Sequence, residues 1–296
     1  MIIVRLKGGL GNQMFQYAAG RRLADTRRTR LKLDLDWYRH IETVATPRRY
    51  ELAVFPVNAM IATETESASF DHHMTMPRLR NLTRNILTFR SQSYVVRERH
   101  FQFDPSVLDL PDGVYLDGYW QSPRYFSDVQ PVIRGAFSFD RKVSEQNRAL
   151  AARISDADSV SIHVRRGDYT SVRSLNYHGV CSMEYYRSAV RTMASKIRNP
   201  VFYVFSDDPA WVKENCSFCR PMIVVEHPGQ EQAYTDMWLM SLCKHHIIAN
   251  SSFSWWAAWL SANPEKIVIA PRQWFRDPNI KTDDLIPAAW LRLDSL

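Results

Sequence analysis

Residues 159–169, SVSIHVRRGDY, form a predicted buried strand that ends abruptly in charged side chains. Its apolar side chains alternate with smaller or polar ones, which is the period of a strand: Val160, Ile162 and Val164. Arg165 and Arg166 follow at once, and adjacent guanidiniums are costly there unless an anionic or acidic group meets them. Ligands of open α/β sheets bind at the carboxyl ends of strands, so phosphate is one expected partner. The alternative is a solvated arginine pair with a local bridge to Asp168.

The chain around this strand alternates predicted strands with predicted helices. The other expected strands are 201–205, 222–225, 246–249 and 266–270. The expected helices are 144–154, 182–197, 231–243 and 251–260, and a short helix starts near Pro209. Alternation over about 130 residues predicts a parallel, doubly wound sheet.

The first half opens with a strand at 2–6, the glycine-rich turn KGGLGNQ at 7–13 and a helix at 14–24. Glycines in such a turn let backbone N–H groups approach a ligand at the helix amino end. The spacing is neither the dinucleotide-binding Gly-x-Gly-x-x-Gly nor a P-loop, so a tight turn without a ligand explains it equally well. Further elements are expected as strands at 31–35, 94–97 and 113–118 and as a helix at 78–87. We therefore predict an α/β protein of two domains, residues 1–150 and 151–296.

The composition is that of a globular protein with a basic surplus. The 296 residues are 45% hydrophobic and 23% charged, and the net charge of +7 favours an anionic partner. Residues 1–40 carry nine Lys or Arg against three acids, a surplus that phosphate, an anionic membrane surface or water would satisfy. No stretch reaches the roughly 18 apolar residues that span a bilayer, and the start does not resemble a signal peptide. We expect a cytoplasmic protein, with peripheral contact to an anionic membrane as a conjecture.

Metal binding has weak support in the sequence. Cys216-x-x-Cys219 is the one close pair among four cysteines, and zinc would need further ligands from His227, Cys243, His245 or His246. Few cysteines in a chain of this length fit a reducing compartment. Asp34-Leu35-Asp36 spells a metal-binding Asp-x-Asp motif, but it belongs to an alternating strand pattern, so we interpret the spelling as incidental.

Polar residues follow three strands of the second half and would meet at one edge of a parallel sheet. They are His163-x-Arg165-Arg166, Ser206-Asp207-Asp208 and Asn250-Ser251-Ser252-x-Ser254. The arginines suit bidentate contact with phosphate, Asp207 suits a ribose or base, and the serines suit either a phosphate or ordinary N-capping. A hydrogen-bonded core position is the better explanation for His163 taken alone. Core packing also explains three tryptophans at helical spacing: Trp255, Trp256 and Trp259.

The expected strand at 113–118 runs into DGYWQS, residues 117–122. Bulky residues with polar tips after a strand are typical of a sugar-binding wall. They are equally typical of a packed aromatic corner, and the residues alone favour neither.

Four blocks of the sequence resemble the α-1,2-fucosyltransferases of glycosyltransferase family 11, and more distantly the α-1,6- and protein O-fucosyltransferases. The blocks are VRLKGGLGNQMFQYA at 4–18, HVRRGDY at 163–169, FYVFSDDP at 202–209, and 236–260, which runs from DMWLMSLC to NSSFSWWAAWL. Residues 117–122 also resemble the family, whereas 40–100 contain no matching motif. The resemblance implies a GT-B enzyme, with two Rossmann-like domains facing a cleft, the donor on the second and the acceptor largely on the first.

The resemblance also implies a reaction and a set of site residues. Fucose would pass from GDP-β-L-fucose to the 2-hydroxyl of a terminal β-galactose, with inversion, on an oligosaccharide or a lipid-linked glycan of the O-antigen or capsule type. The catalytic residues would be Arg165, Asp168 and Asn12. The remaining donor contacts would come from Gly11, Gln13, His163, Arg166, Asp207, Ser252, Phe253 and Ser254. The acceptor side would be formed by Asp117, Tyr119, Trp120 and Gln121.

The chemistry of the reaction fits the arginine pair. Breaking the fucosyl–phosphate bond develops negative charge on the diphosphate, which Arg165 can stabilise directly. We therefore expect no essential metal and no cofactor besides the donor. The identity of the catalytic base stays open. Arginine neighbours weaken Asp168 as a proton acceptor, and a role in orienting Arg165 or Arg166 explains this residue equally well. The other candidates for the base are Asp117, Glu231 and Asp236.

Three alternatives remain. A fucosyltransferase of another linkage would fit the wider superfamily. A non-enzymatic anion or nucleic-acid binder is suggested by the basic first forty residues, but these lack the interleaved aromatic side chains of oligonucleotide-binding surfaces, so we expect no nucleic-acid partner. A nucleotide-dependent oxidoreductase would need the Gly-x-Gly-x-x-Gly turn, which the sequence lacks.

Overall fold

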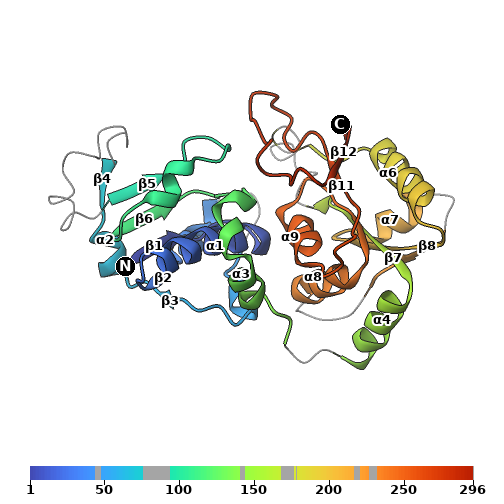
Figure 1. The fold of residues 1–296 in the computed structure, drawn as a ribbon, viewed down its shortest axis with the longest axis horizontal. Helices are drawn as coiled ribbons and strands as arrows, with labels where there is room; N and C mark the ends of the chain where they lie inside the picture. The colour runs from blue at the N-terminus through green and yellow to red at the C-terminus, as the bar shows by residue number, and fades with distance from the viewer. Residues whose placement is uncertain are drawn as a thin grey trace. The chain divides into compact units, whose positions relative to one another are not determined.

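The computed structural model describes residues 1–43, 48–75, 94–140, 144–167, 177, 179–216, 221–226 and 232–295. They form two compact units, each with a six-stranded sheet (Figure 1). The first unit is Met1–Ser138 with Thr282–Leu285, and the second is Phe139–Lys281 with Ile286–Leu296. Every described strand pair is parallel, so the predicted α/β class with two Rossmann-like domains is confirmed. The first unit's main segment ends at residue 138 rather than 150.

The first unit's sheet has the strand order β3-β2-β1-β6-β5-β4. Its strands are β1 (Ile2–Arg5), β2 (Leu31–Asp34), β3 (Met60–Ile61), β4 (Asp71–Thr75), β5 (Tyr94–Arg97) and β6 (Val114–Asp117). Its helices are α1 (Leu10–Thr26), α2 (Glu64–Ala68) and α3 (Gln130–Ala136), with 3-10 turns at Asp36–Thr43, Leu52–Val54, Pro105–Asp109, Pro123–Tyr125 and Ser127–Val129. In the central strand β1 the three apolar residues Ile2, Ile3 and Val4 are all buried, as is typical of a strand in a parallel sheet.

The glycine-rich turn leads directly into α1. Gly8 has a φ of +79°, a left-handed conformation that glycine adopts without steric cost. The helix begins at Leu10 rather than at residue 14, so Gly11, Asn12 and Gln13 form its first turn and not a loop before it.

The second unit's sheet has the strand order β12-β11-β10-β7-β8-β9. Its strands are β7 (Asp158–Val164), β8 (Pro200–Ser206), β9 (Met222–Val224), β10 (His245–Ile247), β11 (Val268–Pro271) and β12 (Leu291–Leu293). Its helices are α4 (Glu145–Asp156), α6 (Met183–Lys196), α7 (Pro209–Asn215), α8 (Gln232–Leu242) and α9 (Ser252–Leu260). The helix predicted at 78–87 lies outside the described residues.

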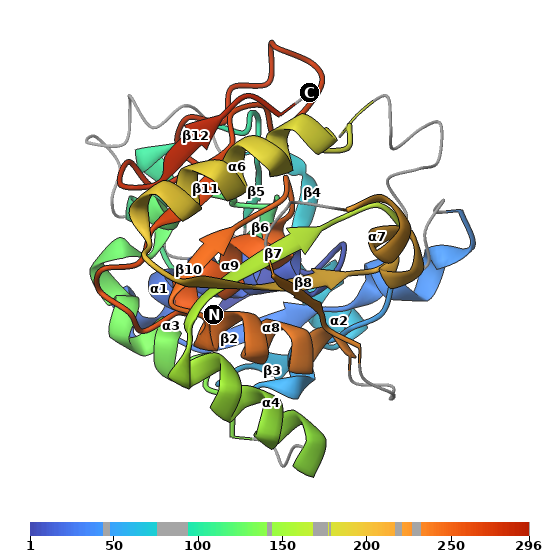
Figure 2. The ribbon, with the colours of Figure 1, turned by 90° about the vertical axis from the view of Figure 1, so that its right-hand side faces the viewer.

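Helices cover both faces of the second sheet (Figures 1 and 2). On one face, Tyr185 of α6 and Val212 of α7 share a core cluster with Val160 of β7. On the other face, the ring of His163 lies 5.6 Å from that of Phe253 on α9. The carboxyl end of β7 therefore lies between helices that pack on the two faces of the sheet.

A short returning segment completes the first unit. The Asp284 carboxylate accepts a hydrogen bond from the Phe103 backbone at 3.1 Å and pairs with Arg124 at 2.8 Å. The Asp284 carbonyl accepts a hydrogen bond from the Ser122 hydroxyl at 2.8 Å. The first unit thus depends on contacts from residues more than 150 positions away.

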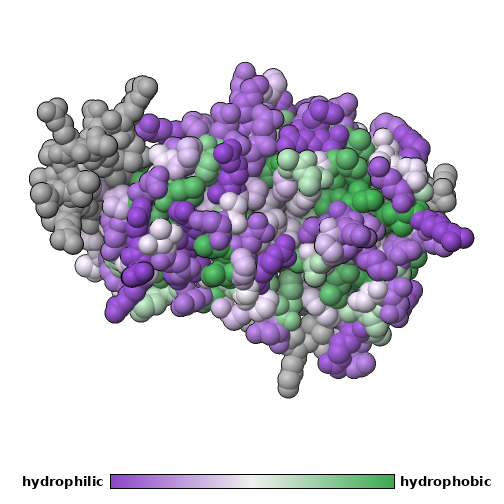
Figure 3. Space-filling view, in the orientation of Figure 1, coloured by the Kyte–Doolittle hydropathy of each residue, from purple (hydrophilic) through white to green (hydrophobic). Residues whose placement is uncertain are grey.

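Hydrophilic and hydrophobic residues are interspersed on the face shown in Figure 3. The exposed large hydrophobic side chains include Met60 and Ile61 on edge strand β3 and Leu291 on edge strand β12. Within the described ranges, none of the helices has the length and apolar character needed to cross a membrane.

Candidate functional site

An ion pair joins the carboxyl ends of two neighbouring strands. β7 and β8 run in register from Asp158–Pro200 to Val164–Ser206, so the residues that follow them are neighbours. Nη1 of Arg165 lies 2.8 Å from Oδ2 of Asp207, and Oδ1 accepts a hydrogen bond from the Arg166 backbone at 2.9 Å. Among the described residues, Asp207 is therefore an acidic group that meets Arg165. Asp168 lies outside the described residues.

Asp207 carries its charge at neutral pH. Burial alone would raise the pKa of the Asp207 carboxyl group. The Arg165 charge and the backbone amides of Arg166 and Gly167 outweigh burial, so the pKa falls below its ordinary value. The side chains of Arg165 and Asp207 are 19% and 23% exposed, so the pair is partly open to a ligand.

Gly167 makes room for this carboxylate. A Cβ added at residue 167 would lie 2.7 Å from Oδ2 and 3.0 Å from Cγ of Asp207, closer than real contacts allow. The glycine of the RRGD segment therefore permits the two strand ends to approach each other. No local pattern in the sequence indicates this role, because Asp207 is 40 positions away from Gly167.

Arg166 lies against an aromatic ring on the next helix. The centre of its guanidinium is 3.7 Å from the centroid of Trp211 on α7, a cation–π contact. Asp208 caps α7 by accepting a hydrogen bond from the Trp211 backbone at 3.2 Å. The residues after β8 thus hold both arginines, Asp207 for Arg165 and Trp211 for Arg166.

His163 is a buried, neutral histidine. It is 4% exposed, and its Nδ1 has no hydrogen-bond partner within the described part of the chain. Burial, and then the charge of Arg165, lower its pKa to about 3. The core position expected from the sequence is correct.

The third strand end is buried. Asn250 is 1% exposed and donates to the carbonyls of Gly179 and Trp274 at 3.3 and 3.2 Å. The Ser254 hydroxyl is fully buried and donates to the Ser251 carbonyl at 3.2 Å. Ser252 and Phe253 are partly exposed at the start of α9. The predicted core placement of the three tryptophans is confirmed: Trp255, Trp256 and Trp259 are buried.

In the first unit, two predicted site residues that are 109 positions apart meet. Nε2 of Gln121 donates to Oδ1 of Asn12 at 2.7 Å. Gln13, in contrast, is fully buried, and its amide forms hydrogen bonds to four backbone groups. Its Oε1 accepts from Glu51 and Leu52 at 2.9 and 3.0 Å, so it secures the segment beside α1. A donor contact for Gln13 stays a prediction.

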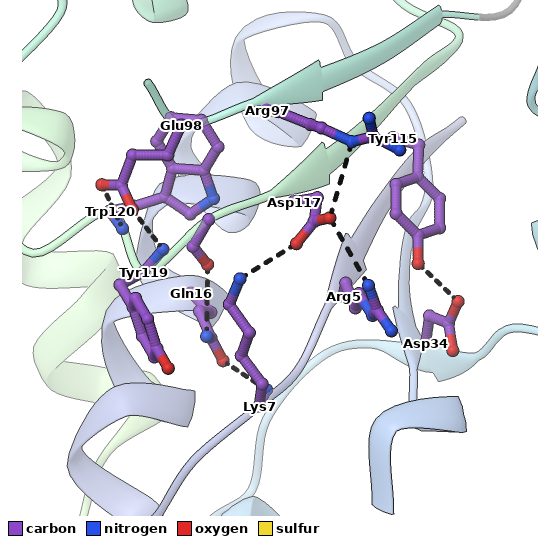
Figure 4. A network of polar contacts seen from close by, with 11 residues as sticks. Arg5, Lys7, Gln16, Asp34, Arg97, Glu98, Tyr115, Asp117, Tyr119 and Trp120 are labelled. Carbon is purple, nitrogen blue, oxygen red and sulfur yellow. Dashed lines mark hydrogen bonds and ion pairs between the residues drawn. The ribbon is translucent and has the colours of Figure 1, made fainter. Parts of the chain in front are cut away.

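Asp117 lies among three cations at the end of β6 (Figure 4). Its carboxylate is 3.0 Å from Lys7, 3.5 Å from Arg5 and 4.0 Å from Arg97. Burial would raise the pKa of Asp117, but these cations, Lys7 first, lower it below its ordinary value. A carboxylate with a lowered pKa is a weak proton acceptor, which counts against Asp117 as the base.

Glu98 is a structural residue that no pattern in the sequence indicates. Its carboxylate accepts hydrogen bonds from the backbone amides of Tyr119 at 2.7 Å and Trp120 at 3.0 Å (Figure 4). Trp120 is 1% exposed and packs edge-on against Tyr125 at 5.7 Å. For Trp120 the packed aromatic corner is therefore correct, whereas Tyr119 is partly exposed, with Lys7 4.8 Å from its ring centroid.

The two sequence motifs that resemble metal sites are Asp34-Leu35-Asp36 and Cys216-x-x-Cys219. Asp34 has protein partners, and part of the cysteine motif lies outside the described residues. Asp34 is 5% exposed and accepts hydrogen bonds from the Tyr115 hydroxyl at 2.7 Å and the Asp36 backbone at 2.8 Å. Cys219 and His227 are not among the described residues. In the described ranges, no three His, Cys, Asp or Glu side chains are grouped so that they would hold a metal ion.

Comparison with known proteins identifies relatives over the full chain. A family model described as glycosyl transferase family 11 matches residues 70–294. The chain is 35% identical over 302 residues to an α-1,2-colitosyltransferase of Escherichia coli, covering 99% of both proteins. It is 32% identical over 300 residues to the O-antigen biosynthesis glycosyltransferase WbnK of Escherichia coli, covering 97% of this chain and 99% of that protein.

Other similarities cover a smaller part of the relative or have a lower sequence identity. Galactoside α-(1,2)-fucosyltransferase 1 of Lagothrix lagotricha is 30% identical over 172 residues, which are 55% of this chain and 47% of that protein. Among solved structures, fucosyltransferase NodZ from Bradyrhizobium has a TM-score of 0.47 at 13% identity, covering 88% of this chain and 92% of that chain.

Proposed function

This chain belongs to glycosyl transferase family 11 and is a glycosyltransferase, and from that premise we propose that it moves L-fucose from GDP-β-L-fucose to the 2-hydroxyl of a terminal β-galactose. The transfer inverts the anomeric carbon and forms an α linkage. The partial similarity to a galactoside α-(1,2)-fucosyltransferase supports the acceptor and the linkage. The full-length similarity to an O-antigen biosynthesis glycosyltransferase supports a bacterial surface glycan as the acceptor.

The observation that carries the proposal is the Arg165–Asp207 pair. It places a guanidinium, oriented by a carboxylate, at the sheet edge where ligands of parallel sheets bind. An arginine can donate to a carboxylate from one side of its fork and to a phosphate from another. In the proposed reaction Arg165 stabilises the charge that develops on the leaving diphosphate, so no metal is needed for that step.

The other predicted site residues take roles that suit their surroundings. Neutral His163 and the partly exposed Ser252 and Phe253 line the donor site beside Arg165, and Arg166 adds a second positive charge. On the acceptor side, Tyr119 offers an aromatic face to the sugar, and Asp117 accepts hydrogen bonds from its hydroxyl groups. Asp168 remains the proposed base or the residue that orients Arg165.

A second donor is favoured by the 35% identity to an α-1,2-colitosyltransferase over nearly the whole chain. Colitose is fucose without its 3-hydroxyl group, so a GDP-activated colitose would present the same leaving group to Arg165. A site that hydrogen-bonds the 3-hydroxyl strongly rejects the sugar that lacks it, whereas a site without that contact accepts both. The donors that the enzyme accepts therefore indicate whether the site forms a hydrogen bond to the 3-hydroxyl group.

One experiment tests the reaction and separates the donors. The full chain is incubated with GDP-fucose or GDP-colitose and a panel of β-galactosides, and the linkage of each product is determined. A galactoside without its 2-hydroxyl is the matched control acceptor. Fucose on the 2-position, absent from the control, supports the proposal, whereas transfer from GDP-colitose alone selects the second donor. Absence of transfer from either donor to every β-galactoside overturns both.

A further inference from the structure

Acidic and basic side chains alternate across the carboxyl edge of the first unit's sheet. The strand register pairs Arg5 of β1 with Asp34 of β2, and it pairs Arg97 of β5 with Asp117 of β6. Across β1 and β6, Nη1 of Arg5 lies 3.5 Å from Oδ2 of Asp117. The four side chains therefore form one row across four neighbouring parallel strands, at the sheet edge where ligands bind (Figure 4).

We infer that Arg5 and Arg97, the two basic members of this row, bind an anionic group of the acceptor glycan. A sugar carboxylate and a phosphate share the chemistry that this requires, because each offers negative charge and hydrogen-bond acceptors to an arginine fork. The inference rests on the proposed function, in which the first unit binds the acceptor, and it narrows that acceptor to an acidic glycan.

The two arginines have more hydrogen-bond donors than the described residues use. A guanidinium carries five N–H groups in a fixed fork. The Arg5 guanidinium has one hydrogen bond among the described residues, the 3.5 Å contact with Asp117. Nε of Arg97 lies 4.0 Å from the same carboxylate, which is beyond hydrogen-bonding distance. The other N–H groups of both side chains can therefore donate to a ligand.

The acidic neighbours already have donors from the protein. The Asp34 carboxylate accepts from the Tyr115 hydroxyl at 2.7 Å, and a backbone amide donates to its other oxygen at 2.8 Å. Both oxygens of Glu98, which follows Arg97 in the chain, accept from backbone amides at 2.7 and 3.0 Å. These carboxylates therefore keep their partners when the arginines turn to a ligand.

Lys7 secures Asp117 from another side. Its Nζ lies 3.0 Å from Oδ1 of Asp117, whereas the arginines approach Oδ2. Removing every partner from a partly buried carboxylate would cost free energy. Because Lys7 stays in place, an anion can draw Arg5 and Arg97 toward itself without leaving Asp117 unpaired.

The basic members of the row are also its more exposed members. The side chains of Arg5 and Arg97 are 34% and 52% exposed, whereas that of Asp117 is 16% exposed. Asp34 is buried. A ligand that approaches the row therefore meets guanidinium groups first. Both of these groups already lie within 4.0 Å of one carboxylate, so they are placed to share a second anion.

Two pairs of acceptors test the inference on the full chain. The first pair is a β-galactoside that carries a neighbouring sugar acid and the methyl ester of the same compound. The second pair is a galactoside on a short polyprenyl diphosphate and its counterpart on the polyprenyl alcohol. In one pair we expect kcat/KM of the wild type to be about tenfold higher for the anionic member, the fold-change of one charge-assisted hydrogen bond. The pair that shows this preference identifies the source of the anion, and ratios near one in both pairs would overturn the inference.

Substitutions connect the preference to the two arginines. Arg97→Gln and Arg5→Gln should each lower the ratio toward one, and Arg97→Glu should reverse it. Melting temperatures are measured for all variants, and Arg97, at the exposed end of the row, keeps the test valid if Arg5→Gln unfolds. An unchanged ratio in Arg97→Glu would overturn the inference.

Arg99→Gln is the matched control. Arg99 is exposed two positions after Arg97, so its replacement removes the same charge from the same region. It should keep the wild-type ratio. A fall equal to that in Arg97→Gln would show a general effect of surface charge and contradict the inference.

A readout that does not need activity separates this inference from the proposed function. The Nε–Hε resonances of Arg5 and Arg97 are assigned in a ¹⁵N-labelled chain from their loss in the glutamine variants. They should shift on titration with glucuronate or pyrophosphate, whereas that of Arg99 should stay in place. Unshifted resonances of both arginines would overturn the inference even in an active enzyme. If the wild-type chain transfers neither sugar, the proposed function fails, and the shifts still decide whether Arg5 and Arg97 bind an anion.

Discussion

Arg165 and Asp207 follow neighbouring parallel strands and meet through an Nη1–Oδ2 distance of 2.8 Å. The pair lies where the seven-residue ladder between β7 and β8 ends. The position of the guanidinium therefore depends on the register of two buried strands, which a shared apolar cluster holds in place. A charged group on such a scaffold keeps its orientation as the substrate binds, which favours electrostatic stabilisation of a leaving group.

Replacing Arg165 with lysine should lower transfer by about 100-fold or more. Lysine keeps the charge but lacks the planar fork that contacts a carboxylate and a phosphate together. The values of kcat and of KM for the donor are measured beside the melting temperature. Arg191→Lys is the control, because Arg191 forms an exposed pair with Glu184 at 2.7 Å. Wild-type turnover in Arg165→Lys would contradict the assigned role.

Gly167→Ala should impair donor binding by moving Asp207. The new Cβ would lie 2.7 Å from Oδ2 of Asp207, so the carboxylate must leave the position in which it orients Arg165. Isothermal titration with GDP should show at least tenfold weaker binding. Gly135→Ala is the matched control, since a Cβ there meets nothing within 4 Å. Equal GDP affinities of the two variants would show that the close approach at Gly167 is irrelevant.

Trp211→Leu should weaken donor binding through Arg166. The cation–π contact is 3.7 Å from the ring centroid, and contacts of this kind contribute about 0.5–2 kcal/mol, which corresponds to roughly twofold to thirtyfold in affinity. Lys213→Ala, on the exposed side of the same helix, should bind GDP as the wild type does. If Trp211→Leu also has wild-type affinity, the ring does not position Arg166.

His163 should make the protein less stable as the pH falls. Its folded pKa of about 3 lies below the ordinary value near 6.5, so below that value the unfolded chain binds a proton that the folded chain does not. The free energy of unfolding should therefore fall between pH 6.5 and 3, by at most about 1.4 kcal/mol per pH unit from this group. His163→Gln should flatten the slope in urea titrations, with His100→Gln as the exposed-histidine control. Identical slopes in the wild type and His163→Gln would contradict the assignment.

Chelation should leave transfer intact. Arg165 supplies positive charge to the leaving diphosphate in the proposed reaction, so turnover in excess EDTA should equal turnover in buffer alone. The measurement is the initial rate with GDP-fucose before and after chelation, with Mg²⁺ or Mn²⁺ added back. Loss of activity that either cation restores would show that a metal takes part.

The sheets were predictable because their signals are local. Alternating apolar residues located β5 at 94–97 and β7 within one residue of its bounds. Three strands were not predicted. Strands β3 and β12 have two and three residues, too few to show a period, and β4 has the sequence DHHMT, which does not alternate apolar with polar residues. The helix α2 was not predicted, although its capping box is a sequence signal for the start of a helix. In this box Thr63 accepts a hydrogen bond from the Glu66 backbone, and the Glu66 carboxylate accepts one from the Thr63 backbone.

The sequence suggests which residues form the candidate site, but it does not show which of them are in contact. Arg165 and Arg166 stand out in the sequence, whereas their partners Asp207 and Trp211 follow another strand, and no local pattern links them to position 165 or 166. Glu98 has no sequence signal, because its partners are backbone amides of residues 119 and 120. Contacts of this kind depend on tertiary structure, which residue spacing does not encode.

The returning segment around Asp284 has a consequence for biosynthesis. Domains usually fold from the amino terminus onward while the ribosome is still translating the rest of the chain. Here Phe103, Ser122 and Arg124 obtain their partner only after residues 139–281 have been synthesised. The nascent first unit therefore stays incomplete until nearly the whole second unit has been translated. During that interval we expect chaperones to bind it.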